Sequence, residues 1–431
     1  MKSLYRGALA SLALPILAGA AQAEPCLQVP STTVSTVERG PLTLEGAVSR
    51  AGNASPEVLL AALEARAASA DADQAGRRLN PAISLETENF AGSGGFQGFD
   101  SYETTLAFEQ TFRLGGKRRL SERAARADAV RARAECGVQR LEAEALAGEL
   151  FLQLQAAIDL ADVADSSAAL SGEFVDIVAR RVEAGAGAPP ELARARAEAA
   201  ALKAVADKAR GEVEAVALAL ASIWGSPSVD FELPARPTDN PGSALPPERA
   251  NMSGHPRLDA ARANAAARLA ATERARAGAW PDVTVTAGVR RFEDTGDSAF
   301  LAGISLPLPV FDQNRDATRA AGIRADGAEL NAKAVEARLR AEQASLVARI
   351  RAAQQSFQRL RDEALPLAEE AYASAAEGYR VGKFDLTTTL DARRSLIETR
   401  ADVIASQLVL ETETLRLRAL IGAAPFNGDT Q

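Results

Sequence analysis

Few side chains in this sequence could take part in chemistry. Among its 431 residues are two cysteines, two methionines and a single histidine, His255. Soft and imidazole metal ligands are therefore almost absent, and no nucleophile has a base beside it. His255 precedes a proline where a helix is expected to start, which is a structural position. The composition predicts a protein that is not an enzyme and holds no cofactor or resident metal.

The first 23 residues have the pattern of an export signal peptide. Lys2 and Arg6 form a basic start, an apolar run covers 8–18, and Ala21-Gln22-Ala23 is an A-x-A cleavage signal. The apolar run is too short to span a bilayer. We therefore expect a mature chain that begins at Glu24 in an oxidising compartment, where disulfides persist.

The two cysteines, Cys26 and Cys136, are expected to form a disulfide. Pro25 is not the small residue that precedes a lipid-anchor cysteine. Cys136 should lie about 29 Å along a long helix from the strands, and helix 45–78 should climb about 51 Å to the same strands. The segment 24–44 could then run back to Cys136, so that the disulfide would fix the N-terminus.

The sequence indicates neither a phosphate-binding loop nor a nucleic-acid partner. The glycine-rich run 92–98 lies between two expected strands and opens no helix, so we interpret it as the loop of a β-hairpin. The chain carries 49 Lys and Arg against 57 Asp and Glu, a net charge of -8. This acidic balance argues against binding nucleic acid.

The elements that position these residues occur twice along the chain. Residues 53–56 match residues 253–256, and Ala184-Gly185 matches Val381-Gly382. Each half should contain a helix, two strands, a very long helix, a glycine turn and a final helix. The expected order is the N-terminal segment 24–44, a first repeat 45–225, a proline-rich linker 226–250, a second repeat 251–422 and a tail 423–431.

Long, thin helices dominate both repeats. Alanine, glutamate, arginine and leucine prevail, which favours helices that pack closely. A helix over 117–183 would be about 100 Å long, and Leu390, Ile397 and Ile404 recur at coiled-coil spacing. The expected helices are 45–78, 117–183 and 190–225, then 255–279, 315–380 with a kink at Pro366, and 385–421, with tip turns at 184–190 and 381–385.

Four segments read as strands with one apolar and one polar face, namely 82–92, 101–112, 282–292 and 300–310. This alternation is typical of outer-membrane β-barrels. A soluble sheet covered by helices is the alternative, but the neighbouring helices should pack on one another. Four strands cannot close a barrel, so chains must combine their strands. Two chains would give a filled barrel, whereas three would leave a lumen, and we favour three.

With these features, the sequence resembles the TolC-like outer-membrane efflux protein family. The resemblance rests on the duplication, on residues 379–393 at the second tip, and on residues 306–315 and 109–118 beside the strands, which are most similar to the CzcC-like (cobalt-zinc-cadmium) branch. It implies a mixed α/β membrane protein, in which three copies form a 12-strand outer-membrane β-barrel continued by an α-helical coiled-coil tunnel through the periplasm.

The resemblance also implies site residues. Asp391 matches one of two gate acids and Thr388 stands at the other. Glu191 matches an acidic position that helps to hold the gate shut, and Tyr379 matches a gate tyrosine. Phe384 replaces a basic residue of the family. A ring of carboxylates in a narrow pore would concentrate cations.

The expected function is an exit duct in the outer membrane of a Gram-negative bacterium, within a three-part proton-driven efflux system. The tips, with Gly185, Val381 and Gly382, would dock onto a periplasmic adaptor, which joins a resistance-nodulation-division pump in the inner membrane. Divalent heavy-metal cations are the favoured substrate. Two alternatives remain open: the same duct for drugs or organic compounds, and a soluble periplasmic coiled-coil scaffold.

Overall fold

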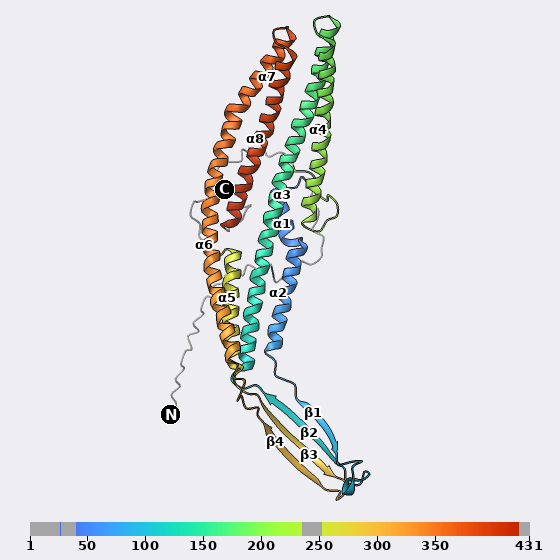
Figure 1. Cartoon of the computed structure of the whole chain (residues 1–431), viewed down its shortest axis with the longest axis vertical. Helices are drawn as coiled ribbons and strands as arrows, with labels where there is room; N and C mark the ends of the chain where they lie inside the picture. Colours follow the sequence, from blue (N-terminus) through green and yellow to red (C-terminus); the bar gives the residue numbers. More distant parts are fainter. Residues whose placement is uncertain (1–25, 27–39, 235–251, 422–431) are drawn as a thin grey trace, which may run out of the picture.

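The chain forms a long rod of helices with a small β-sheet at one end (Figure 1). This computed structural model describes residue 26, residues 40–234 and residues 252–421. The expected signal peptide 1–23, the tail 423–431, nearly all of 24–39 and the linker residues 235–250 lie outside the described residues.

The same order of elements occurs in both halves. The first half contains α1 (Leu44–Ala54), α2 (Pro56–Ala75), β1 (Ala82–Glu88), the short helix η1 (Gly94–Phe96), β2 (Glu103–Phe112), α3 (Lys117–Glu183) and α4 (Pro189–Ser222). The second half contains α5 (Pro256–Ala277), β3 (Val283–Phe292), β4 (Ser298–Ser305), α6 (Arg315–Arg359), η2 (Leu360–Ala364), α7 (Leu365–Arg380) and α8 (Leu386–Leu420).

Proline accounts for the main differences from the expected boundaries. The helix expected over 45–78 is divided into α1 and α2, because Ser55 before Pro56 adopts an extended ψ of 130°. Strand β4 ends at Ser305 rather than at residue 310, and the next residues include Pro307 and Pro309, which have no N–H for the ladder.

The two long helices differ in continuity. Helix α3 runs unbroken over 67 residues, about 100 Å. Its counterpart contains Pro366 and is interrupted just before it by the π-helical segment η2, which separates α6 from α7. A proline inside a helix removes one backbone hydrogen bond and crowds the preceding turn, and a wider π-turn accommodates this. The expected irregularity is therefore present as a π-segment.

The four strands form one antiparallel sheet in the order β1-β2-β3-β4. In this register Leu85 pairs with Leu106 and Leu106 with Val289, so the apolar side chains share one face. That face is bare, since Ile83 is 75% and Phe300 is 92% exposed. Both outer strands have an unpaired edge within the described chain.

The opposite face of the sheet is polar. Arg290 of β3 donates to the carboxylates of Glu88 on β1 and Glu103 on β2, at 3.1 and 2.8 Å, and to the hydroxyl of Thr105 at 2.9 Å. Each strand thus has one face suited to lipid and one suited to water, as the alternation predicts.

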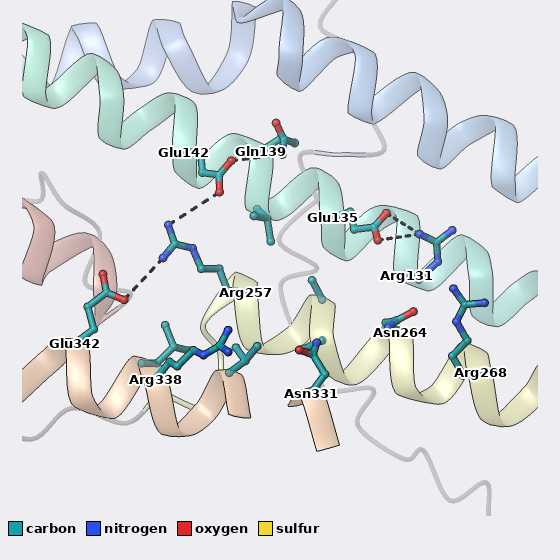
Figure 2. A pocket seen from close by; sticks show the side chains of 15 residues that line it. Arg131, Glu135, Gln139, Glu142, Arg257, Asn264, Arg268, Asn331, Arg338 and Glu342 are labelled. Carbon is teal, nitrogen blue, oxygen red and sulfur yellow. Dashed lines mark hydrogen bonds and ion pairs between the residues drawn. The ribbon is translucent and has the colours of Figure 1, made fainter. Parts of the chain in front are cut away.

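Helices pack side by side in two groups that share α3. Near the sheet the order is α2, α3, α5 and α6, and toward the other end it is α4, α3, α8 and α7 (Figure 1). Arg257 of α5 lies between two carboxylates, 4.0 Å from Glu142 of α3 and 3.8 Å from Glu342 of α6 (Figure 2). No helix in the described part of the chain is long and apolar enough to cross a membrane.

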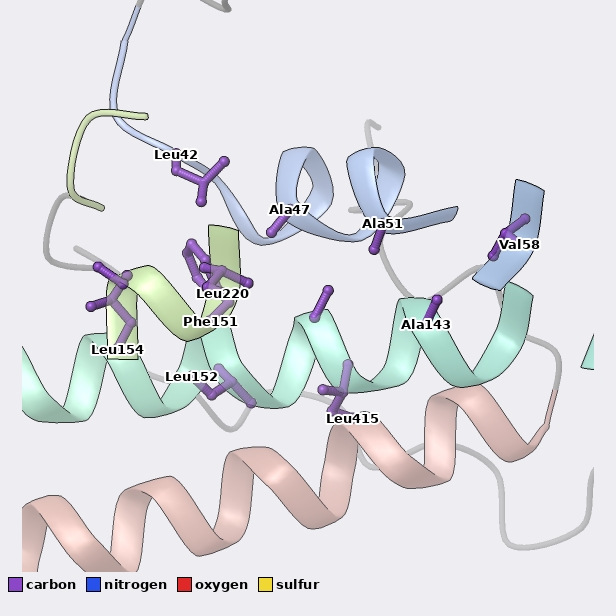
Figure 3. Packing of buried hydrophobic residues seen from close by; sticks show 12 residues of the cluster. Leu42, Ala47, Ala51, Val58, Ala143, Phe151, Leu152, Leu154, Leu220 and Leu415 are labelled. Atoms are coloured by element: carbon purple, nitrogen blue, oxygen red, sulfur yellow. The ribbon is translucent and has the colours of Figure 1, made fainter. Parts of the chain in front are cut away.

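A central core lies where α1, α4 and α8 meet α3 (Figure 3). Ala47 and Ala51 of α1 pack toward Phe151 and Leu154 of α3, and small side chains allow the helices to approach closely. Beyond this core, a disulfide joins Cys26 to Cys136 with the Cα atoms 6.1 Å apart, against Ala62 of α2.

Candidate pore gate at the hairpin ends

Two helical hairpins, α3 with α4 and α7 with α8, end close together at the opposite pole from the sheet (Figure 1). Each turns at a glycine with positive φ, Gly185 at +69° and Gly382 at +79°. The N–H of Ala186 donates to the Arg181 carbonyl at 2.9 Å, and the N–H of Lys383 donates to that of Gly378 at 2.7 Å. These are equivalent Schellman closures, so both tips have one backbone geometry.

Tyr379 connects the two hairpins. Its side chain is buried at the end of α7, and its hydroxyl donates to the Glu191 carboxylate of α4 at 3.1 Å. Its ring lies 5.3 Å from the ring of Phe174 and 4.4 Å from the guanidinium of Arg181, both on α3. Arg181 also donates to the Tyr379 carbonyl. Tyr379 is therefore held by four contacts to three residues of the first repeat.

This environment changes the acidity of the phenol. Burial and the hydrogen bond to the Glu191 carboxylate raise the pKa of Tyr379 to about 12. Both effects disfavour a phenolate, since it would lack solvation and face a negative charge. The hydroxyl therefore remains a donor throughout the physiological range.

Thr388 and Asp391 stand apart from this contact. The backbone N–H of Thr388 donates to the Asp385 carboxylate at 2.8 Å and caps α8. Side-chain and backbone hydrogen bonds with Thr388 lower the pKa of Asp385. Asp391 is exposed on α8, and within the described residues its carboxylate has no hydrogen bond or ion pair. The structure thus brings Tyr379 and Glu191 together, and leaves the expected gate acid exposed.

A second contact between the hairpins involves a residue that sequence analysis missed. Arg393 of α8 is only 2% exposed, and its Nη2 lies 2.7 Å from the Glu198 carboxylate of α4. Its guanidinium is 5.6 Å from the ring of Phe174. The seven-residue spacing of Leu390 and Ile397 contained the signal, because Arg393 falls at an inward position of that heptad.

The rest of the chain offers little chemistry. Among the described residues no group of histidine, cysteine and acidic side chains could hold a metal ion. A groove of about 640 Å³ lies between α3, α5 and α6, away from the hairpin ends (Figure 2). Its charges are largely engaged with one another, as in the pair between Arg131 and Glu135 at 2.8 Å.

Comparison with known proteins assigns the chain to a family. The family model for "Outer membrane efflux protein" matches residues 47–226 and again residues 251–423, one match for each repeat. The chain belongs to the outer membrane efflux protein family. It is therefore a transport protein of the outer membrane, and the expected efflux role is confirmed.

Relatives of this outer membrane efflux protein include two resistance proteins. The cobalt-zinc-cadmium resistance protein CzcC of Cupriavidus metallidurans is 28% identical over 84% of this chain and 85% of its own length. The nickel-cobalt-cadmium resistance protein NccC of Alcaligenes xylosoxydans xylosoxydans is 28% identical over 69% of this chain and 68% of its own.

Solved structures confirm the TolC-like fold. CusC superposes with a TM-score of 0.76 at 17% identity, covering 88% of this chain and 91% of that one. The outer membrane protein VceC of Vibrio cholerae gives 0.72 at 22% identity, covering 88% and 96%.

The raised pKa of Tyr379 predicts an alkaline transition. A group with a raised folded pKa stabilises the fold fully below its ordinary pKa of 10, and this contribution is lost as the pH rises through about 12. The tyrosinate absorbance of the native protein minus that of Tyr379→Phe should titrate near 12. Glu191→Gln should lower this midpoint, and a native midpoint near 10 would contradict the buried hydrogen bond.

Arg393 should contribute to holding the hairpins together, because its loss leaves Glu198 without its cation. We expect Arg393→Gln to lower the free energy of local unfolding at the hairpin contact by on the order of 3 kcal/mol. Hydrogen exchange of residues 386–400 and 189–200 should quicken accordingly. The matched control is Arg196→Gln, which changes the equivalent but exposed arginine of the first repeat. Equal exchange rates in both variants would show that Arg393 does not join the hairpins.

Proposed function

We propose that three copies of this chain form the outer-membrane duct of a tripartite, proton-driven efflux system, and that the duct exports divalent heavy-metal cations. The four-stranded sheet with a bare apolar face and two unpaired edges is the observation that carries the assembly. In lipid every backbone N–H and C=O needs a partner, so β1 of one copy must pair with β4 of the next.

The number of copies follows from the size of the barrel. Two sheets of this kind would give eight strands, and side chains fill a barrel of that size. Three sheets give twelve strands, with the face that carries Arg290, Glu88 and Glu103 turned to a water-filled lumen. A head-to-tail contact that closes into a ring leaves no strand edge facing lipid.

Exposed apolar side chains on both sides of the helical rod also favour assembly of the copies into a ring. Leu60 and Leu63 on α2 are 67% and 51% exposed, while Ile323 and Leu330 on α6 are 65% and 68% exposed. Helices α2 and α6 lie at opposite ends of the row near the sheet. Large apolar side chains on both sides are explained if α2 of one copy packs against α6 of the next.

The hairpin tips are the proposed docking surface for a periplasmic adaptor, which would link the duct to an inner-membrane pump of the resistance-nodulation-division class. Gly185 and Gly382 are exposed, and Val381 is 53% exposed at the extreme end of the rod. The contact between Tyr379 and Glu191 would stabilise the closed state behind these tips.

The substrate is inferred from similarity to CzcC and NccC, which are named for resistance to divalent metals. The described residues provide no metal-binding group, so choice among metals would be made by the pump. In the ring, the exposed Asp391 carboxylates of three copies would face one another near the mouth and attract cations.

Deletion of the gene in its native host tests the substrate. Tolerance to zinc, cobalt and cadmium should fall several-fold and return with a plasmid copy, while tolerance to hydrophobic drugs stays unchanged. Purified protein in detergent should have the mass of three chains. If deletion lowers tolerance to drugs alone, the substrates of the duct are organic compounds and not metals. If salt without detergent extracts the protein from membranes, a soluble scaffold is favoured instead.

Asp391 should determine the preference of the duct for cations. In planar bilayers with a salt gradient, Asp391→Asn should shift the reversal potential toward zero, since the ring would lose its negative charge. Asp71→Asn removes an exposed acid on α2 far from the tips, and should leave the reversal potential unchanged. If both variants behave as the native protein does, Asp391 is not at the narrowest point.

A further inference from the structure

Basic residues gather where the helices join the sheet. The four connections together with the adjoining helix turns, residues 76–81, 113–119, 274–282 and 306–316, contain nine Lys and Arg against three Asp, although the whole chain is acidic at -8. All four connections lie at one level of the rod (Figure 1). We call these nine residues the basic collar: Arg77, Arg78, Arg113, Lys117, Arg118 and Arg119 from the first half, with Arg274, Arg276 and Arg315 from the second.

Most of the basic collar faces solvent without a partner. Eight of its residues are exposed, and Lys117 is the exception, 2.8 Å from the Asp282 carboxylate. Lys117 is also the only collar residue with an ion pair inside the described part of the chain. Arg118 also donates to the Gly76 carbonyl at 2.9 Å, and the other seven side chains are available to an external anion.

Local helix stability does not explain these residues. Lys117, Arg118 and Arg119 occupy the first turn of α3, which contains no acidic residue. Cations at a helix N-terminus oppose the helix dipole, so this arrangement is locally unfavourable. An anion bound from outside the chain would offset that cost.

The basic collar begins where the apolar face of the sheet ends. Phe112, Trp280 and Phe311 are 52%, 60% and 99% exposed at this border. The Trp280 ring packs directly over Gly115, whose φ of +63° and lack of Cβ make room for it. Tryptophan and arginine together are typical of the boundary between hydrocarbon and lipid head groups.

We propose that the basic collar binds the phosphate groups of anionic phospholipids in the periplasmic leaflet of the outer membrane, an inference that rests on the proposed barrel. The collar is on the helical side of the sheet, opposite to the loop that contains η1 (Figure 1). This places it at the periplasmic leaflet. Each basic residue near an anionic surface strengthens binding by about fivefold.

The test uses the detergent-solubilised native oligomer, titrated with dioleoylphosphatidylglycerol or dioleoylphosphatidylcholine and analysed by native mass spectrometry. The native protein should prefer phosphatidylglycerol. The triple variant Arg77→Gln, Arg113→Gln and Arg315→Gln should bind it about fivefold more weakly per charge removed. Arg113→Gln alone provides a milder variant, with about a fivefold loss.

The matched control removes three exposed arginines from the helical rod, through Arg196→Gln, Arg324→Gln and Arg394→Gln. This control should retain the preference. Equal affinity of the native protein for the two lipids, or equal losses in both triple variants, would overturn the proposal. Conductance in phosphatidylcholine bilayers is measured in parallel. If the native protein does not conduct, the proposed duct function is refuted. If it conducts but has no lipid preference, only the proposed lipid binding by the basic collar is refuted.

Discussion

Close packing along α3 is the interaction on which the rest of the structure depends. Helices α1, α2, α4, α5 and α8 pack along this one rod, and both repeats are joined through it. Most of its buried residues are small, for example Ala129, Ala147, Gly148 and Ala161. Small side chains bury little area each, but they let helix backbones approach closely over a great length. The stability of the rod therefore comes from many weak contacts in series.

Apolar residues are buried in the helical part of the molecule and exposed on one face of the sheet. In the helices, alanine seams are buried and charged residues cover the outside. In the sheet, Ile83, Phe300 and Ile304 are exposed while Arg290 is paired on the other face. The change occurs within the short connections, at Trp280 and the basic collar. One continuous chain thus suits two different surroundings, water along the helices and lipid around the sheet.

The sequence predicted the helices and strands well, because glycine and proline mark most of their ends. The break between α1 and α2 was missed, although the repeat contained it: Pro56 corresponds to Pro256, and both begin a helix. Tyr379 and Glu191 were each selected by the family resemblance, whereas their hydrogen bond to one another was found in the structure. Arg393 was missed because an arginine is usually assigned to a solvated face, whereas its heptad position is buried. Asp391 makes no hydrogen bond or ion pair within the described chain, so its proposed role can arise only between copies.

The duplication explains why both hairpins have the same backbone geometry at their ends. The residues that make the polar contacts between the hairpins, in contrast, are not duplicated. The two glycine turns superpose in sequence with an offset of 197, and the same offset relates Arg393 to Arg196. The partners of Arg393 have no such counterparts, because Phe174 corresponds to Ala371 and Glu198 to Ser395.

Tyr379 likewise corresponds to Val182, and Glu191 to Thr388. The polar contacts that join the first hairpin to the second therefore cannot be repeated where the second hairpin meets the first hairpin of another copy. The two kinds of interface in a ring would share a backbone arrangement and differ in strength. In such a ring, the hairpin ends would separate first at the interfaces between copies, because the buried ion pair and the tyrosine hydrogen bond are both missing there.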